Sequence, residues 1–304
     1  MRSHGKALCL LMSAFFIVAT SPIAFAQDGS PTGQCGFQTL NFSPPANNGV
    51  PLALNDAGAI VGEFQDSQSH FHGFLLYQGK LTTFMFPGSI NTTPNDINRT
   101  GTIVGSYNVA GDQKTHPFMV QSGGFRQITL PGFPNASATA LGVNENGDVV
   151  GTIASATEFF GMGYLLHKGK LTIISFPGAN GGTEPTSIND QGVIVGNYHL
   201  TSADPSHGFM WKAGVFSNIN PPDSDGSAFV TKISNTGDIV GTYVSAVDNH
   251  PHGFSFANGT YTKIDVPGSQ DTFIRAVNKF DNVLASAQPG TKVVQVKGFC
   301  SAVF

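Results

Sequence analysis

One segment returns six times along this chain of 304 residues, and its nearly constant period limits what the chain can fold into. The copies are LNDAGAIVG (54–62), INRTGTIVG (97–105), VNENGDVVG (143–151), INDQGVIVG (188–196), ISNTGDIVG (233–241) and VNKFDNVLA (277–285). Their second residues are spaced by 43, 46, 45, 45 and 44 positions. Such a period indicates one supersecondary unit per repeat, and neighbouring units bury a shared core between them.

A second motif keeps the same phase and completes the unit. Its copies are HGFLLYQGKL (72–81), HPFMVQSGGF (116–125), MGYLLHKGKL (162–171), HGFMWKAGVF (207–216), HGFSFANGTY (252–261) and the shortened KGFCSAVF (297–304). Glycine-containing turns separate short runs rich in β-branched and aromatic residues, which is typical of strands joined by hairpins. Each unit is therefore predicted to hold four strands, which in the first copy are 50–55, 59–64, 73–78 and 80–86.

The segment CGFQTLNFSPP (35–45) has no repeat before it, although it reads like the fourth-strand segment GKLTTFMFPGS (79–89). This pattern predicts a ring in which residues 35–43 complete the last unit, 273–304. The predicted fold is therefore all-β, a six-bladed β-propeller of four-stranded antiparallel blades, because propellers leave only short, protected sheet edges. A β-solenoid and paired β-sandwiches are the alternatives.

Composition agrees with short strands and turns. Charged residues make up 11% of the chain, against about 25% in an ordinary globular protein, and its 37 glycines exceed the usual share of about 7%. The formal net charge of −4 argues against nucleic acid or anionic lipid as a partner.

The first 26 residues have the order of a secretory signal peptide. Arg2 and Lys6 precede an apolar run from 7 to 19, and Ala24-Phe25-Ala26 resembles a cleavage site. The run is too short for a good membrane span. Residues 27–304 are therefore expected to be one exported domain without membrane insertion, extracellular or periplasmic, and a monomer.

Two cysteines remain in the mature chain, Cys35 near its start and Cys300 near its end. In an oxidising compartment such a pair is a candidate structural disulfide, which would join the two ends within one blade. Two buried free thiols are the alternative.

The N-x-x-G-x-[IV]-V-G segment followed by H-G-F resembles the HAF-repeat family of bacterial extracellular proteins. The resemblance covers nearly all of 35–304 and implies a secreted repeat protein of undefined biochemical role. The sixth copy departs from the pattern, with Asp281 at the turn glycine and Leu284-Ala285 in place of Val-Gly.

A histidine recurs at one place in four of the six copies, where Met162 and Lys297 stand in the others, and an asparagine recurs at another place in five copies. Such repetition favours structural roles over catalysis, because one active site does not need several copies. The histidines are His72, His116, His207 and His252, and the repeated asparagine is expected to bond nearby backbone groups in its turn. The pairs His70/His72 and His250/His252 have a spacing that places both rings on one face of a strand, where zinc can bind, but no third ligand accompanies them.

Polar residues that differ from blade to blade are the candidates for a single ligand site. The long loops of a propeller converge at its axis, so their face is the default site for a ligand. The candidate ligand-binding residues are Asn95, Asp96, Glu184, Asp223, Asp225, Asp271 and Arg275, with Lys232 and Arg275 as the main bases within the first strands of the repeats. Solvated loop residues are the alternative interpretation.

Three functions remain open. The absence of G-x-S-x-G, H-E-x-x-H and G-x-G-x-x-G patterns favours a non-catalytic binding module for a glycan, peptide or protein, without a required cofactor. The alternative is an extracellular hydrolase or lyase at the propeller axis with calcium as its candidate cation, which requires Asp96, Glu184 and Asp271 to converge. A structural protein of the cell envelope is the third.

Overall fold

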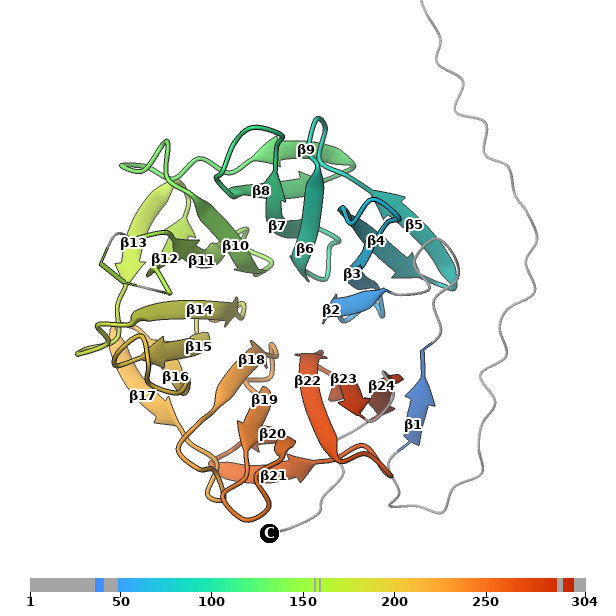
Figure 1. Cartoon of the computed structure of the whole chain (residues 1–304), viewed down its shortest axis with the longest axis vertical. Coiled ribbons are helices and arrows are strands. Elements are labelled where there is room, and N and C mark those ends of the chain that lie inside the picture. Colours follow the sequence, from blue (N-terminus) through green and yellow to red (C-terminus); the bar gives the residue numbers. More distant parts are fainter. Residues whose placement is uncertain (1–35, 41–48, 156, 159, 289–291, 298–304) are drawn as a thin grey trace, which may run out of the picture.

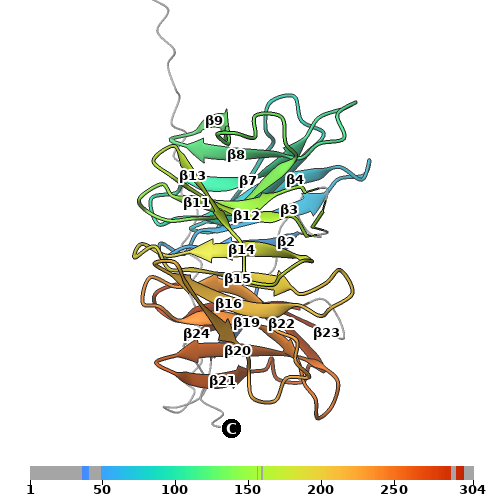
Figure 2. The same cartoon turned by 90° about the vertical axis from the view of Figure 1, so that its left-hand side faces the viewer.

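A computed structural model describes residues 36–40, 49–155, 157–158, 160–288 and 292–297. Its strands form four-stranded antiparallel sheets that stand like blades around a central axis (Figure 1). Figure 2 shows the ring edge-on, with the strands crossing its thickness. The chain is therefore an all-β propeller of four-stranded antiparallel blades, as the repeat predicts.

Five sheets each consist of four consecutive strands, called blades 1 to 5 here. Blades 1 and 2 contain β2 (Val50–Leu54), β3 (Ile60–Gln65), β4 (Phe71–Tyr77), β5 (Lys80–Phe84), β6 (Asn91–Ile97), β7 (Ile103–Asn108), β8 (His116–Gln121) and β9 (Gly124–Gln127). Blades 3 and 4 contain β10 (Ala138–Val143), β11 (Val149–Ile153), β12 (Met162–His167), β13 (Lys170–Ile174), β14 (Gly182–Ile188), β15 (Ile194–His199), β16 (His207–Lys212) and β17 (Val215–Ile219). Blade 5 contains β18 (Phe229–Ile233), β19 (Ile239–Val244), β20 (Pro251–Ala257) and β21 (Thr260–Ile264).

The sixth sheet combines the two ends of the chain. Its order is β1-β24-β23-β22, with β1 (Gly36–Thr39), β22 (Asp271–Val277), β23 (Asn282–Gln288) and β24 (Lys292–Lys297). Strand β1 pairs antiparallel with β24, with Gly36 opposite Lys297 and Thr39 opposite Val294. Cys35 and Cys300 lie outside the described residues, as does the predicted signal peptide.

The innermost strand of each blade joins the second strand through an inner turn, and the third joins the fourth through an outer turn. Antiparallel pairing places both kinds of turn on one face of the ring, the turn face, and the longer connections on the other, the loop face. In blade 1 the innermost strand ends at Leu54 rather than Asn55, because the Asn55 side chain accepts the backbone N–H of Ala59 at 2.9 Å and closes the turn.

Every innermost strand contains a β-bulge near its end. One residue is left without a partner on the second strand, namely Leu52, Asn95, Leu141, Thr186, Thr231 and Arg275. A bulge redirects the side chains that follow it. In blades 2, 4 and 5 the residue after the bulge consequently lines the axis, as Asp96, Ser187 and Lys232.

The last glycine of the repeat allows the innermost strand to approach the second. A Cβ on Gly241 would lie 2.2 Å from the carbonyl oxygen of Phe229 and 2.8 Å from the Phe254 ring. Its counterparts Gly62, Gly105, Gly151 and Gly196 are equally crowded. The sixth sheet has Ala285 at this place, fully buried, so that sheet alone accommodates the methyl group.

Apolar cores lie between neighbouring blades and explain the H-G-F motif. The aromatic residue of the motif is fully buried in all five blades, as Phe74, Phe118, Tyr164, Phe209 and Phe254. Asp281, which replaces the turn glycine of the sixth copy, adopts φ of 57° and donates its N–H to the Asn278 carbonyl at 3.0 Å. The sixth repeat thus makes the same inner turn with a conformational free-energy penalty, because only glycine adopts a left-handed backbone conformation freely.

Candidate functional site at the propeller axis

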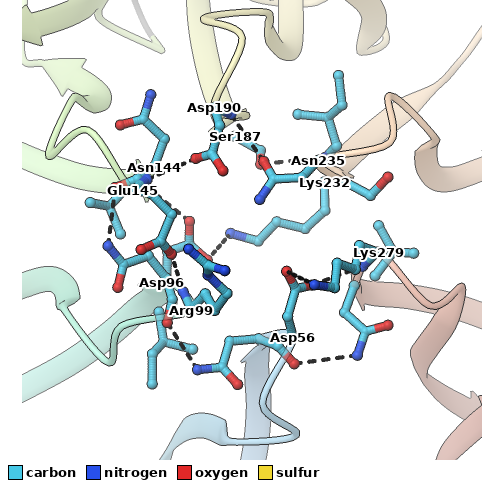
Figure 3. Close-up of a pocket in the computed structure, with 18 of the residues that line it drawn as sticks. Asp56, Asp96, Arg99, Asn144, Glu145, Ser187, Asp190, Lys232, Asn235 and Lys279 are labelled. Atoms are coloured by element: carbon cyan, nitrogen blue, oxygen red, sulfur yellow. Dashed lines mark hydrogen bonds and ion pairs between the residues drawn. The ribbon is translucent and has the colours of Figure 1, made fainter.

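A small polar hollow lies where the inner turns meet at the axis (Figure 3). Its volume is about 60 Å³, and residues of all five blades and of the sixth sheet line it. This space suits a few water molecules, each of which occupies about 30 Å³ in the liquid. It lies on the turn face, whereas the sequence placed the ligand site on the loop face.

The repeated asparagines form a ring of hydrogen bonds around this hollow. Each side-chain Nδ2 donates to the backbone carbonyl of the counterpart residue one unit further around the ring. The bonds run from Asn55 to Asn98 (2.9 Å), from Asn98 to Asn144 (3.1 Å), from Asn144 to Asn189 (3.1 Å), from Asn189 to Ser234 (3.4 Å) and from Asn278 to Asn55 (3.3 Å). The last bond links the sixth sheet to blade 1.

The other half of each amide serves its own turn. The Oδ1 of Asn98, for example, accepts the N–H of Thr102 at 2.8 Å, and that of Asn189 accepts the N–H of Val193 at 3.0 Å. The predicted turn role of the asparagine is thus confirmed, and its role between blades is the part that the repeat did not indicate. One amide satisfies both because it carries a donor and an acceptor on opposite sides.

The ring has one break, at Ser234 of blade 5. Its hydroxyl accepts the N–H of Asp238 at 3.1 Å and lies 2.6 Å from the Thr236 hydroxyl. Among the described residues, no hydrogen bond joins the Ser234 side chain to Asn278, and serine has no amide that could serve both its own turn and the neighbouring unit. Blade 5 and the sixth sheet therefore lack the link that the other neighbours have.

A second ring follows one residue later and carries most of the charge at the mouth of the hollow. It consists of Asp56, Arg99, Glu145, Asp190, Asn235 and Lys279. Four of these side chains accept a backbone N–H from a neighbouring unit of the ring. Glu145 accepts from Arg99, Asp190 accepts from Glu145 at 2.8 Å, Asn235 accepts from Asp190 at 3.0 Å, and Asp56 accepts from Lys279 at 2.9 Å. These side chains thus link neighbouring units.

An ion pair spans the axis inside these rings. Lys232 Nζ lies 2.8 Å from Asp96 Oδ1, and only 9% and 11% of the two side chains are exposed. They come from β18 and β6, which stand on opposite sides of the ring (Figure 1). The second oxygen of Asp96 accepts the Val143 N–H at 3.0 Å.

The counterparts of Asp96 and Lys232 in the other units are small. They are Ala53, Gly142, Ser187 and Ala276, each directly after its bulge. Their small side chains leave the space that two long side chains fill from opposite directions. The ion pair therefore fills the axis at the turn face.

Of the predicted site residues, Asp96 alone reaches this hollow. Asn95 occupies the bulge and donates to the Ala140 carbonyl at 2.8 Å, a bond between blades that Thr231 repeats with Ile274. Arg275 occupies the same place in β22 and donates through Nε to the Ser286 hydroxyl at 3.2 Å. Burial lowers the pKa of Arg275.

Glu184 lies in β14 on the loop-face side of its bulge. Burial raises the pKa of its carboxyl group, because the charged form is poorly solvated there. Among the predicted site residues, Glu184 is thus the carboxyl group whose raised pKa favours the protonated form, which is the form that a general acid needs.

The remaining candidates lie at or near the loop face. Asp225 accepts the Ser227 N–H at 2.9 Å, and Asp271 Oδ1 lies 3.0 Å from His250 Nδ1. Asp223 lies in the same loop as Asp225, between β17 and β18. Asp271 stands five residues before Ala276, the counterpart of Asp96, which at about 3.3 Å per residue is roughly 16 Å along the strand. Asp96 and Asp271 are therefore not brought to one point.

The charged ring went unpredicted, although the sequence contains a signal for it. The residue after the repeated asparagine or serine is charged in five of the six copies, as Asp56, Arg99, Glu145, Asp190 and Lys279. The sequence also places Lys232 as a base within its strand, but no sequence pattern pairs it with Asp96.

The motif histidines form a separate and repeated arrangement on the loop face. Each bonds an aspartate of the preceding loop, in the pairs His72–Asp66 (2.8 Å), His116–Asp112 (2.9 Å), His207–Asp204 (2.8 Å) and His252–Asp248 (3.0 Å). Each also lies against an aromatic ring of the second strand, with centroids 5.1–5.8 Å apart. This repetition supports the structural interpretation of the histidines.

Hydrogen bonds lower the pKa of Asp66, Asp112 and Asp248 and so favour their charged forms. The His70 backbone N–H, followed by the His72 ring, lowers the pKa of Asp66 to about 2, and the His250 N–H lowers that of Asp248 to about 2. Within the described ranges, no group of three or more His, Cys, Asp or Glu side chains is placed to hold a metal ion. In the same ranges no helix has the length and apolarity to cross a membrane.

Comparisons with known proteins agree on the fold. The chain is similar to the β-propeller domain of the Trilobed protease from Pyrococcus furiosus, with 11% identity, a TM-score of 0.55, and coverage of 82% of this chain and 78% of that one. It is also similar to TolB from Acinetobacter baumannii (13%, TM-score 0.48, 82% and 55%) and to the six-bladed lectin of Aleuria aurantia (11%, 0.48, 83% and 95%). It thus spans about half the length of TolB. No protein-family model and no curated protein matches the chain, and the similarity to the domain of the Trilobed protease shows a β-propeller fold.

Proposed function

We propose that this protein is an exported, non-catalytic binding module that recognises a glycan, peptide or protein. The observation that carries this proposal is that the acidic groups at the axis are already engaged in hydrogen bonds between blades. Asp56, Asp96, Glu145 and Asp190 each accept a backbone N–H from another blade.

A hydrolase needs an acid or base that is free to exchange a proton with its substrate. Asp96 is held by Lys232 and by the Val143 N–H, so its charge is already compensated. The hollow of about 60 Å³ also leaves no room for a substrate. These features support a scaffold at the axis and recognition elsewhere on the surface.

The proposal includes export through the segment 1–26 and a six-bladed ring closed by the N-terminal strand. The pairing of β1 with β24 supports this closure, and a Cys35–Cys300 disulfide would make it covalent. The resemblance to HAF-repeat proteins supports the same cellular location. Mass spectrometry of the exported protein, with and without reduction, tests the cleavage after Ala26 and the disulfide together.

The binding function is tested with purified residues 27–304 on arrays of glycans and peptides, beside a panel of glycosidase, esterase and lyase substrates. The proposal expects a saturable ligand and no turnover. Turnover that survives purification to homogeneity would refute it.

Glu184 favours a second candidate, a hydrolase or lyase near the axis on the loop-face side, because burial raises its pKa. If this candidate holds, Glu184→Gln abolishes turnover while ligand affinity changes little. The binding module instead expects Glu184→Gln to leave every measured property nearly unchanged. Thermal unfolding with chelator and with calcium tests the cation that the enzyme would use.

A further inference from the structure

A second hollow lies on the turn face between blades 2 and 3, away from the axis. Blade 2 contributes β9 and the residues after it, and blade 3 contributes its inner and outer turns, at 146–147 and 168–169. The two blades are neighbours at the top of the ring in Figure 1. The volume of about 350 Å³ is within the range of small-ligand sites, roughly 300–1,000 Å³.

The floor of this hollow is aliphatic. Met119, Ile128 and Val149 are buried beneath it, with 3%, 4% and 1% of their surfaces exposed. Leu166 is half-buried beside them. An aliphatic ligand group that packs on this floor binds favourably, because its own apolar surface is removed from water.

The rim carries two cations, Arg126 and Lys168, which are both exposed. Among the described residues that line the hollow there is no Asp or Glu. The Nη2 of Arg126 lies 2.9 Å from Met119 Sδ, which holds the guanidinium above the floor. In the described part of the chain, the lysines and arginines that pair with carboxylates are Lys232, Lys263 and Lys279, so both rim cations are available to a ligand.

Both cations depart from the repeat. Arg126 lies opposite Met119 on the neighbouring strand, and the residues in this register in the other blades are Thr82, Thr172, Ser217 and Thr262. Lys168 occupies the left-handed position of its outer turn, with φ of 48°, where the other blades have Gln78, Ser122, Ala213 and Asn258. The scaffold thus needs neither charge, yet both departures meet at one hollow.

We propose that this hollow binds a carboxylate carried by an aliphatic group, either a free short-chain acid or the C-terminal residue of a polypeptide. The guanidinium of Arg126 has donors in the fork geometry that matches a carboxylate, and Lys168 adds a second positive charge. The aliphatic floor receives the side chain or hydrocarbon part. This inference rests on the proposed binding function and names its ligand chemistry.

Calorimetric titration of residues 27–304 with N-acetyl-leucine and with its uncharged amide tests the charge requirement. The acid is expected to bind at least ten-fold more tightly than the amide and to weaken as salt rises, because exposed charges are screened. Acetate, which lacks the aliphatic group, is expected to bind at least ten-fold more weakly than N-acetyl-leucine. Equal affinity of acid and amide would overturn the proposal.

The double variant Arg126→Thr/Lys168→Gln gives the hollow the residues that other blades have at these places, so the fold is expected to persist. It is expected to lose at least ten-fold in affinity for N-acetyl-leucine. Lys80→Thr is the matched control, since it removes an exposed charge of blade 1 that does not line the hollow. Unchanged affinity of the double variant would place the ligand elsewhere.

Further titrations separate the sources and the alternatives. Tighter binding of 4-methylpentanoate or of a peptide ending in leucine identifies the free acid or the polypeptide as the source. Tighter binding of glucuronate than of N-acetyl-leucine would refute the aliphatic part of the assignment. An array ligand that binds the double variant normally would leave the proposed function intact and reject this hollow as its site.

Discussion

The asparagine ring and the Asp96–Lys232 pair lie side by side at the axis, but they follow opposite rules. The ring uses one residue type in five of the six units, and each bond joins immediate neighbours. The pair uses residues that occur once each and joins blades on opposite sides of the ring. Repeated residues thus hold neighbouring blades together, whereas unrepeated residues at equivalent positions give the propeller its individual features.

The largest effect is expected from breaking the pair on one side. Lys232→Ala leaves Asp96 buried without its counter-charge, which should lower the free energy of unfolding by about 3–5 kcal/mol. Urea denaturation followed by the fluorescence of Trp211, the single tryptophan, measures this loss.

The double variant Asp96→Ala/Lys232→Ala is its control. Alanine already occupies this place in blade 1 and in the sixth sheet, as Ala53 and Ala276. Removing both charges should therefore recover most of the lost stability. A double variant as unstable as Lys232→Ala would mean that the side chains matter through packing and not through charge.

The repeated glycine extends the comparison to the scaffold. Gly241→Ala should lower the free energy of unfolding by about 2–3 kcal/mol, because its Cβ would overlap the Phe229 carbonyl oxygen. Ala285→Gly in the sixth sheet is the reverse change and should cost about 1 kcal/mol or less. Equal effects of the two changes would show that the sheets do not differ in this contact.

The break in the ring offers a smaller test. Asn98→Ser should cost about 1 kcal/mol by removing one bond between blades, and Ser234→Asn should add up to about 1 kcal/mol by supplying the missing one. Denaturation midpoints of both variants measure this. If Ser234→Asn destabilises the protein, blade 5 and the sixth sheet are too far apart for the bond.

The smallest effect concerns the loop-face aspartates. The pKa of Asp66 is lowered from 3.8 to about 2 in the folded state, so its contribution to stability is complete above pH 3.8 and is lost as the pH falls toward 2. Asp248 follows the same rule. The melting temperature of Asp66→Asn/Asp248→Asn should therefore fall less steeply between pH 4 and pH 2 than that of the parent.

Much of the fold was predictable because it repeats. The period indicated the four-stranded unit, and the turn role of the asparagine followed from local chemistry that needs only nearby backbone. The charged position after the asparagine recurs in the same copies, but repetition of charge alone does not predict a ring of bonds between blades. The residue at this position is polar in every copy, but its charge differs from copy to copy.

The sequence by itself determined the unit, its strands and the residues that link each turn to its own backbone, because these interactions lie within a few residues of one another. Only the tertiary structure decided that Asp96 meets Lys232 and that Arg126 and Lys168 line one hollow. Asp96 and Lys232 meet because the ring curves until opposite blades face each other across the axis. Arg126 and Lys168 share a hollow because the outermost strand of blade 2 and the turns of blade 3 line the same space, and no local pattern encodes either arrangement.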